Sequence, residues 1–174
     1  MAMLHIGQAS TLWFFSRHRD TMKEFEIPIL THFLDWKNGY PQLATQKRWM
    51  LPFTAAASAF SMIAGVHHIV VLANFEAYTT DLRKGINRFR WWEYAISSSV
   101  MISLIALLFG VQDIMTLIGI VSVNVSMNLF GLLFEVMNSN LKEAGKDVVD
   151  WQSYIYATFN AVAFLSIVLV SVFG

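Results

Sequence analysis

Residues 89–111 read Phe-Arg-Trp-Trp-Glu-Tyr-Ala-Ile-Ser-Ser-Ser-Val-Met-Ile-Ser-Leu-Ile-Ala-Leu-Leu-Phe-Gly-Val, and a second apolar run covers residues 114–134. A bilayer core about 30 Å thick is crossed by roughly 20 helical residues, so either run is long enough to cross once. Only Gln112 and Asp113 separate the two runs. This short link predicts an antiparallel pair of membrane helices.

Two further segments have the same character, at residues 51–75 and 151–174. The whole chain is 56% hydrophobic and 14% charged, whereas a soluble domain has about 25% charged residues. Backbone inside a bilayer must satisfy its own hydrogen bonds, which favours helices, and the segments lack the two-residue alternation of a membrane β-barrel. We therefore predict an all-α fold, a bundle of four transmembrane helices in the lipid bilayer.

The loops between these segments differ in charge. Basic side chains occur in loop 74–90 and in loop 137–150, whereas the Gln112-Asp113 link has none. The positive-inside rule places both basic loops in the cytoplasm. With four crossings, both chain ends are then expected outside, and we expect the membrane to be the plasma membrane.

Residues 1–50 are predicted to form an ordered extracellular segment, not a span, ahead of the membrane region 51–174. The Asn38-Gly39 pair lies between two short β-branched or aromatic runs, which indicates a β-hairpin. The apolar run 10–15 is too short for the core of a signal peptide, so no removable targeting segment is expected.

Composition and motifs exclude several classes of function. The twelve basic and twelve acidic side chains cancel, and no basic stripe supports nucleic-acid binding. The chain has no cysteine, which removes disulfides, thiol catalysis and cysteine-ligated metals. The sequence also lacks a phosphate-binding loop, a zinc-protease motif and a nucleophile elbow, so we do not expect an enzyme.

Glu93 is the most informative candidate, because a carboxylate inside an apolar span is costly and indicates a functional site. One interpretation pairs it with Arg90, three residues earlier and near the interface. The other turns Glu93 into the bundle, where it neutralises a buried cation. Ser97 and Met101 follow at helical spacing and extend the same face.

His67 and His68 lie in the first span. Neighbouring helical residues point about 100° apart, so only one of them is expected to face the bundle squarely. A metal site is not expected, because adjacent residues do not share a helix face. The inward histidine either makes an interhelical hydrogen bond or exchanges a proton.

The third span concentrates small and polar residues, namely Asn124, Asn128, Ser122, Ser126 and Gly131. Residues of this kind usually hold membrane helices together at close distance. Asn124 has a second interpretation, in which it lines a ligand pocket with Met127.

The second span resembles a known family. Residues 87–102 read Asn-Arg-Phe-Arg-Trp-Trp-Glu-Tyr-Ala-Ile-Ser-Ser-Ser-Val-Met-Ile, which is similar to the Arg-Trp-x-Glu-Tyr-Ser motif of heliorhodopsins and its following serines. Residues 110–114 resemble the family's Gly-x-x-Asp-Ile turn, 123–131 its Asn-x-Ser-Met-x-x-x-Gly stretch, and 67–70 its His-x-Ile-Val segment. The resemblance covers residues 25–174, and residues 1–24 match nothing in it.

Heliorhodopsins are seven-helix retinal proteins with a cytoplasmic amino terminus, and the resemblance places the four spans at their second to fifth helices. It implies that Glu93 is the counterion of the retinal Schiff base and that His67 accommodates a proton. The residues that it places in or near the retinal pocket are Ser97, Met101, Asn124, Met127 and Gly131.

The lysines depart from this pattern, because the family binds retinal through a lysine of its seventh helix. The six lysines here are Lys23, Lys37, Lys47, Lys84, Lys142 and Lys146, and none lies in a predicted span. Covalent attachment is therefore not expected in this chain as written, and the first, sixth and seventh helices have no counterpart. We expect the sequence to come from a truncated reading frame whose first two dozen residues are adventitious. The alternative is a short protein without photochemistry.

The resemblance implies a light-sensing membrane photoreceptor that forms a homodimer and signals through an unidentified partner. Two other classes stay open on the residues alone. One is a non-photochemical helix-bundle subunit that uses its helices for protein contacts. The other is a small channel or transporter with Glu93 and Asn124 along a polar path.

Overall fold

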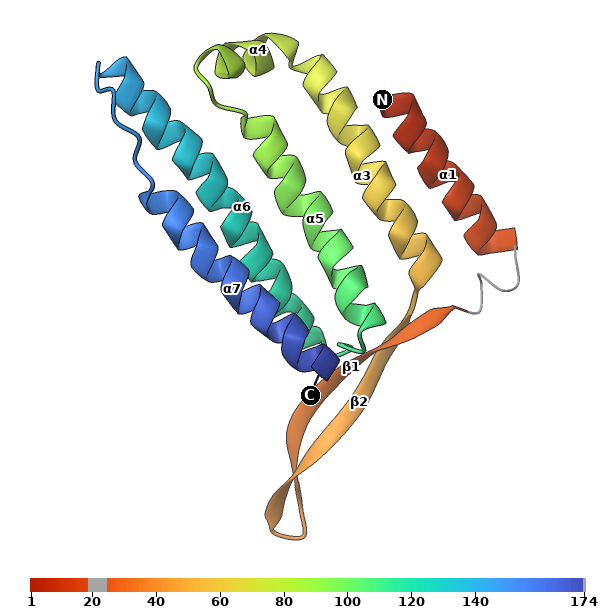
Figure 1. Cartoon of the computed structure of the whole chain (residues 1–174). Coiled ribbons are helices and arrows are strands. Elements are labelled where there is room, and N and C mark those ends of the chain that lie inside the picture. The colour runs from red at the N-terminus through yellow and green to blue at the C-terminus, as the bar shows by residue number, and fades with distance from the viewer. Residues whose placement is uncertain (19–24, 174) are drawn as a thin grey trace.

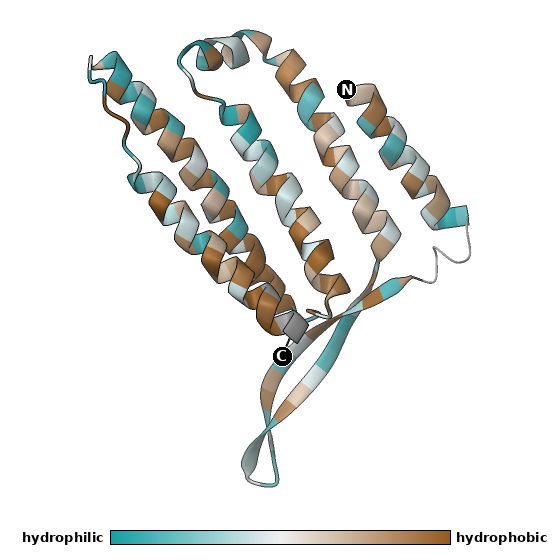
Figure 2. Ribbon diagram, viewed as in Figure 1, coloured by the Kyte–Doolittle hydropathy of each residue, from teal (hydrophilic) through white to brown (hydrophobic). Residues whose placement is uncertain are grey.

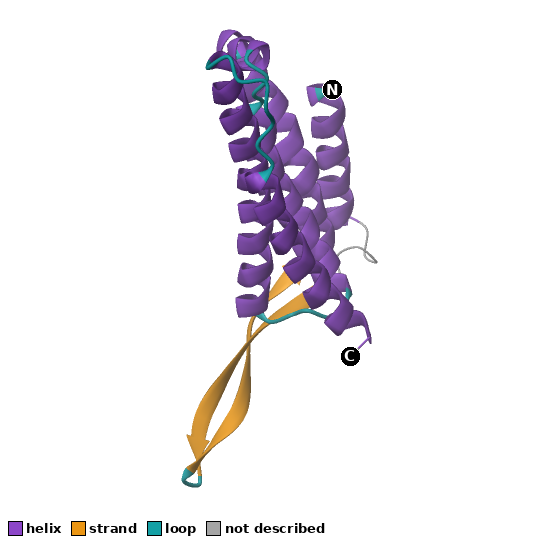
Figure 3. Ribbon diagram, turned by 60° about the vertical axis from the view of Figure 1, so that its left-hand side comes forward, coloured by secondary structure: helices purple, strands orange, loops and turns teal. Residues whose placement is uncertain are grey.

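The computed structural model describes residues 1–18 and 25–173. Its elements are α1 (Ala2–His18), β1 (Glu26–Lys37), β2 (Tyr40–Pro52), α3 (Phe53–Ala73), α4 (Phe75–Arg83), α5 (Arg88–Leu108), α6 (Ile114–Glu143) and α7 (Gln152–Phe173). The long helices stand side by side in chain order, so that α5 packs between α3 and α6 (Figure 1). The two strands form a hairpin that projects from one end of this row (Figure 3).

Three helices in the described part of the chain are long and apolar enough to cross a membrane: α3, α5 and α6. Figure 2 shows that the brown, apolar residues of α5 gather toward its hairpin end, whereas its α4 end is paler and partly teal. The chain is therefore an integral membrane helical bundle, as predicted, with a small two-stranded sheet added. Residues 152–173 form the fourth predicted helix, α7, but its crossing of the membrane stays a prediction.

Helix α6 is longer than the predicted span 114–134, because it continues to Glu143. The added turns carry polar side chains that have partners. Asn138 donates to the Asp150 carbonyl at 3.0 Å and accepts from the Asp150 N–H at 2.7 Å. These two bonds fasten the connection between α6 and α7 to the end of α6.

The hairpin turns at Asn38 and Gly39, whose φ angles are 55° and 84°. Positive φ at both central residues is typical of the type I′ turn that the Asn-Gly pair predicts. The base of the hairpin joins the bundle, because Ile27 and Ile29 of β1 form an apolar cluster with Leu107 of α5. The tip extends well beyond the helix ends (Figure 3).

Helix α1 was not expected: residues 2–18, which we predicted as part of an extracellular segment, form a helix within the bundle. The helix packs along α3, where Ala9 is only 1% exposed. Gly65 of α3 allows this approach, since a Cβ there would lie 2.8 Å from Ile6. Hydropathy alone did not show α1, because its burial depends on a partner distant in the sequence.

The two chain ends lie at opposite ends of the bundle, which differs from the expectation that they share one side (Figure 1). Helix α1 runs antiparallel to α3, since His5 faces His68 whereas Trp13 lies against the earlier Met62. Met1 is therefore at the α4 end of the bundle, and α7 ends at the hairpin end (Figure 1). The expectation rested on four helices and did not include α1.

Candidate functional site

A cavity of about 770 Å³, open along the face of the bundle, lies between α3 and α5 and reaches α4. Its walls are mostly aliphatic and aromatic. The lining residues are Ala59, Met62, Ile63, Val66, His67, Val70, Asp81, Arg88, Phe89, Trp92, Glu93 and Ile96. Ligand pockets commonly have volumes of about 300–1,000 Å³ with a few placed polar groups, and this cavity has that composition.

Glu93 and His67 form the polar pair of the cavity. His67 Nε2 lies 3.5 Å from a carboxylate oxygen of Glu93, and the two side chains are 15% and 18% exposed. Helix α3 presents His67 and helix α5 presents Glu93, both from apolar surroundings. The Glu93 side chain therefore points toward α3, as the inward interpretation expects, and the buried cation that it would neutralise stays a prediction.

The alternative pairing of Glu93 with Arg90 is wrong. The Arg90 guanidinium pairs with Glu135 of α6, which also accepts from the Asn87 N–H at 2.7 Å. Among the described residues, no lysine or arginine lies within ion-pair distance of Glu93. The carboxylate thus lies next to an apolar cavity with a histidine as its nearest titratable partner.

His68 also faces a helix, which the sequence analysis did not expect. Its ring stacks on His5 of α1, with centroids 5.5 Å apart and an interplanar angle of 22°. The expectation that only one of the two histidines points into the bundle failed because α3 has neighbours on two sides. His67 faces α5, and His68 faces α1.

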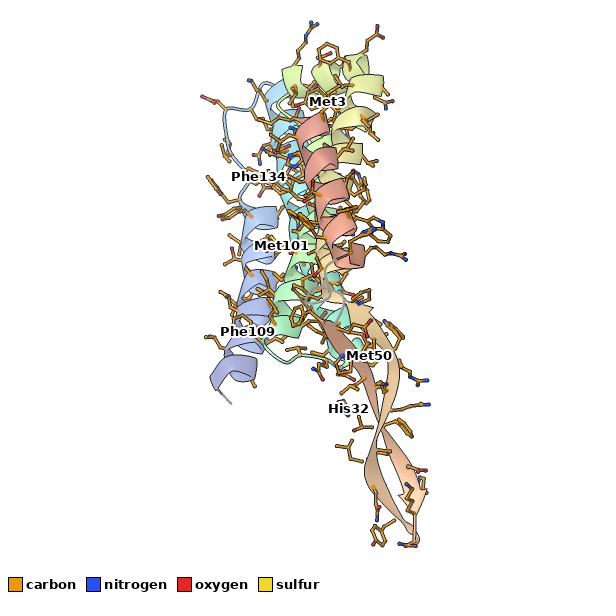
Figure 4. All side chains as sticks on the ribbon, turned by 90° about the vertical axis from the view of Figure 1, so that its right-hand side faces the viewer. Met3, His32, Met50, Met101, Phe109 and Phe134 are labelled. Atoms are coloured by element: carbon orange, nitrogen blue, oxygen red, sulfur yellow. The ribbon has the colours of Figure 1, made fainter. Side chains whose placement is uncertain are left out.

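The other predicted pocket residues do not line this cavity. Ser97 is buried, and Met101 is 42% exposed on a more distant turn of α5 (Figure 4). Met127 is half-buried on α6. Asn124 instead donates to two serines of α5, at 2.7 Å to Ser98 and 3.0 Å to Ser99. Their predicted roles toward retinal stay predictions.

Gly131 serves close packing between α5 and α6. A Cβ at this position would collide with the indole ring of Trp91. On the opposite side of α6, Ser126 accepts a hydrogen bond from Asn160 of α7 at 3.2 Å. These contacts are of the interhelical kind that small and polar residues favour in membranes.

Sequence reasoning missed one polar pair of the cavity. Asp81 of α4 pairs with Arg88 at the start of α5, and both residues line the α4 end. The two residues are seven positions apart with a loop between them, and this spacing does not predict that their side chains meet. The pair is placed there by the fold of α4 over the end of the cavity.

The side chains that line the cavity fit an elongated apolar ligand with one positive charge better than they fit a metal ion. The described residues contain no group of three metal-ligating side chains. Retinal, which the resemblance implies, has a suitable apolar character for these walls, and the Glu93 carboxyl group would lie beside the cationic end of such a ligand. No lysine is among the cavity residues, and the role of Glu93 toward retinal stays a prediction.

Comparison with known proteins agrees with these observations. The heliorhodopsin family model matches residues 1–174. No curated protein matches the chain. The family match begins at residue 1, so the expectation that residues 1–24 fall outside the family is wrong. Since the match covers the whole length, the chain belongs to the heliorhodopsin family.

Proposed function

We propose that residues 1–174 form the part of a retinal-based light sensor that contains the Schiff-base counterion. Glu93 is the counterion, and His67 is the proton-accommodating residue. The observation that carries this proposal is the 3.5 Å Glu93–His67 pair at an apolar cavity of about 770 Å³. Membership of a family of retinal photoreceptors supports it. A sensor of this kind is a membrane photoreceptor and not a classical enzyme.

The electrostatic argument starts from the cost of a carboxylate in a region of low dielectric. Two unit charges 4 Å apart attract by about 4 kcal/mol at an effective dielectric constant of 20. An ionised Glu93 therefore favours a cationic ligand end in the cavity. Retinal bound through a lysine supplies light absorption, isomerisation and such a buried positive charge.

His67 is placed to respond when that charge moves. Its Nε2 atom lies next to the Glu93 carboxylate, so a proton leaving the ligand end has a base on the neighbouring helix. Histidine is the side chain best suited to bind a proton near neutral pH. The proton then stays within the bundle, which suits a sensor more than a pump.

The remaining proposals concern placement and partners. We place loops 74–90 and 137–150 in the cytoplasm, so that Met1 is cytoplasmic and the hairpin extracellular. Helix α1, which precedes the hairpin, takes the position of the family's first helix. The plasma membrane location, the homodimer and the signalling partner follow from the resemblance alone.

Reconstitution with all-trans retinal tests the proposal. We expect no strong covalent visible band from the chain alone, and a band when the chain is joined to a helix that carries the attachment lysine. Glu93→Gln is expected to shift that band to longer wavelength, because a counterion has been removed. His67→Gln should mainly alter the light-driven proton exchange.

Two other functions are outcomes of the same test. Ion flux across vesicles without retinal would support a channel that uses Glu93. If no visible absorption band forms, even with the added helix that carries the lysine, the result would support a non-photochemical subunit that makes protein contacts only. A band insensitive to Glu93→Gln contradicts the counterion assignment in particular.

A further inference from the structure

The cavity between α3 and α5 is open along its side. Seven of its twelve lining residues are exposed, among them Met62 and Val66 of α3 and Ile96 of α5. Both helices are long and apolar enough to cross a membrane, and they stand side by side (Figure 1). The opening therefore lies at the depth of the bilayer, where an entering ligand comes from the lipid and not from water.

Polar and apolar groups are separated along this cavity. Asp81 and Arg88 lie at its α4 end, and Glu93 follows Arg88 by five residues, or about 7–8 Å of helix. The cavity residues of α3 that precede His67 are all apolar, and they lead toward the hairpin end of the bundle. The cavity therefore has a polar end near the membrane surface and an apolar part toward the bilayer centre, as a lipid molecule in one leaflet has.

Glu93 is the acid of this polar end that is available to a ligand. The Asp81–Arg88 pair cancels its own charge. Among the described residues, no lysine or arginine lies within ion-pair distance of Glu93. His67, at 3.5 Å, can share a hydrogen bond or a proton with the carboxyl group, but its ring carries no permanent charge. A positively charged group that entered the cavity would therefore meet a carboxyl group without a fixed cationic partner.

We propose that the cavity binds a long-chain primary amine that enters sideways from the bilayer, with its ammonium group beside Glu93 and its chain along the apolar residues of α3. A primary ammonium group donates hydrogen bonds to a carboxylate, and such charge-assisted bonds are stronger than bonds between neutral groups. An uncharged chain of the same length gains only the apolar contacts. The inference goes beyond the proposed function, because a free amine needs neither retinal nor an attachment lysine.

Native mass spectrometry of the chain in an uncharged detergent tests the proposal. Dodecylamine is compared with dodecanol, which has the same chain and no charge, at about pH 8, where a primary amine is protonated. We expect dodecylamine to bind about tenfold more tightly than dodecanol, because only the amine forms a charge pair with Glu93. Equal affinities for the two ligands would overturn the proposal.

Substitutions at Glu93 test the position of the ammonium group. Glu93→Gln should weaken dodecylamine about tenfold, to the affinity of dodecanol, and leave dodecanol unchanged. Glu93→Asp keeps the charge and should keep the preference for the amine. The matched control is Glu76→Gln, which removes an exposed carboxylate of α4 outside the cavity and should change neither affinity. Circular dichroism checks that each variant keeps its helices. A preference for the amine that survives in Glu93→Gln would overturn the assignment.

Substitutions on α3 test the path of the chain. Ala59→Trp fills the apolar part of the cavity and should weaken both ligands about tenfold, as when roughly two methylene groups no longer fit. Leu72→Trp is the matched control, because Leu72 is an exposed residue of the same helix outside the cavity. Unchanged binding in Ala59→Trp would contradict the proposed path. Retinal is absent from all these measurements, so their failure and the failure of the proposed photoreceptor are separate results.

Discussion

Helix α5 has two neighbours, and its two interfaces are built differently. Toward α6, Asn124 donates to Ser98 and Ser99, and Trp91 fits over Gly131. Toward α3, Glu93 meets only His67 beside a cavity of about 770 Å³. Short hydrogen-bonded side chains bring α5 and α6 close together, whereas the side chains between α3 and α5 leave an open, mostly apolar space beside Glu93.

This contrast predicts that substitutions at the α5–α6 interface lower the free energy of unfolding more than substitutions at the α3–α5 interface. The α3–α5 interface should contribute to ligand binding instead. Residues that keep a site ready for a charged ligand commonly reduce stability, because the site is incomplete without that ligand. The following measurements, ordered from the largest expected effect to the smallest, test the contrast.

Gly131→Leu should have the largest effect on the free energy of unfolding. The new side chain collides with Trp91, and overpacking of this kind costs about 3 kcal/mol. SDS titration in mixed micelles measures the loss. Gly119→Leu is the matched control on the same helix, since nothing lies within 4 Å of a Cβ at that position. Similar losses at both glycines would contradict close packing between α5 and α6.

Asn124→Ala should destabilise the chain by about 1–2 kcal/mol, because it removes interhelical hydrogen bonds to two serines. The same SDS titration measures this change. Ser122→Ala is the control, because the Ser122 hydroxyl donates only to the Ile118 carbonyl of its own helix at 2.8 Å. If the two variants unfold at the same SDS concentration, the Asn124 contacts do not join the helices.

Asp113→Ala should cost about 1 kcal/mol, the usual value of a helix N-cap. The Asp113 carboxylate accepts from the Thr116 N–H at 2.8 Å and from the Thr116 hydroxyl at 2.9 Å. Burial raises the pKa of Asp113, but hydrogen bonds from Thr116 and His32 outweigh it, so the pKa lies below its ordinary value near 3.8.

This lowered pKa fixes the sign of the pH dependence. The stabilisation by Asp113 is complete above the ordinary pKa and is lost as the pH falls through the lower pKa of the folded state. Unfolding titrations at several pH values below 5 should show this loss in the wild type. Asp113→Asn keeps a capping oxygen and should remove only the acid dependence, so an unchanged pH profile would contradict the assignment.

Glu93→Gln should have the smallest effect, within about 0.5 kcal/mol of zero or slightly stabilising. The substitution removes a charge that has no lysine or arginine partner among the described residues, and a neutral amide costs less in an apolar environment. The same titrations without retinal measure it. A loss as large as that of Asn124→Ala would mean that Glu93 is a structural residue.

The membrane helices could be predicted because their signal is local. The runs 51–75, 89–111 and 114–134 coincide with α3, α5 and the first part of α6. Each run satisfies its own backbone hydrogen bonds and is long and apolar enough to be recognised by its mean hydropathy. The Asn38-Gly39 turn was equally local, since two residues with positive φ determine it.

The candidate site was only partly predictable. Glu93 and His67 stood out as polar groups inside apolar spans, and the structure brings them within 3.5 Å. Asn124 and Gly131 carried the same kind of signal, yet they face a different interface. Spacing along a helix shows which residues share a face, but it does not show which neighbour that face meets.

The sequence alone determined that this chain is a membrane helical bundle with a hairpin turn and a carboxylate within an apolar span, because hydropathy and turn chemistry act over a few residues. The tertiary structure decided which helix lies beside which. It brought α1 against Gly65, Arg90 to Glu135 and Asp81 to the cavity. These contacts join residues far apart in the chain, so they depend on packing geometry that no local pattern contains.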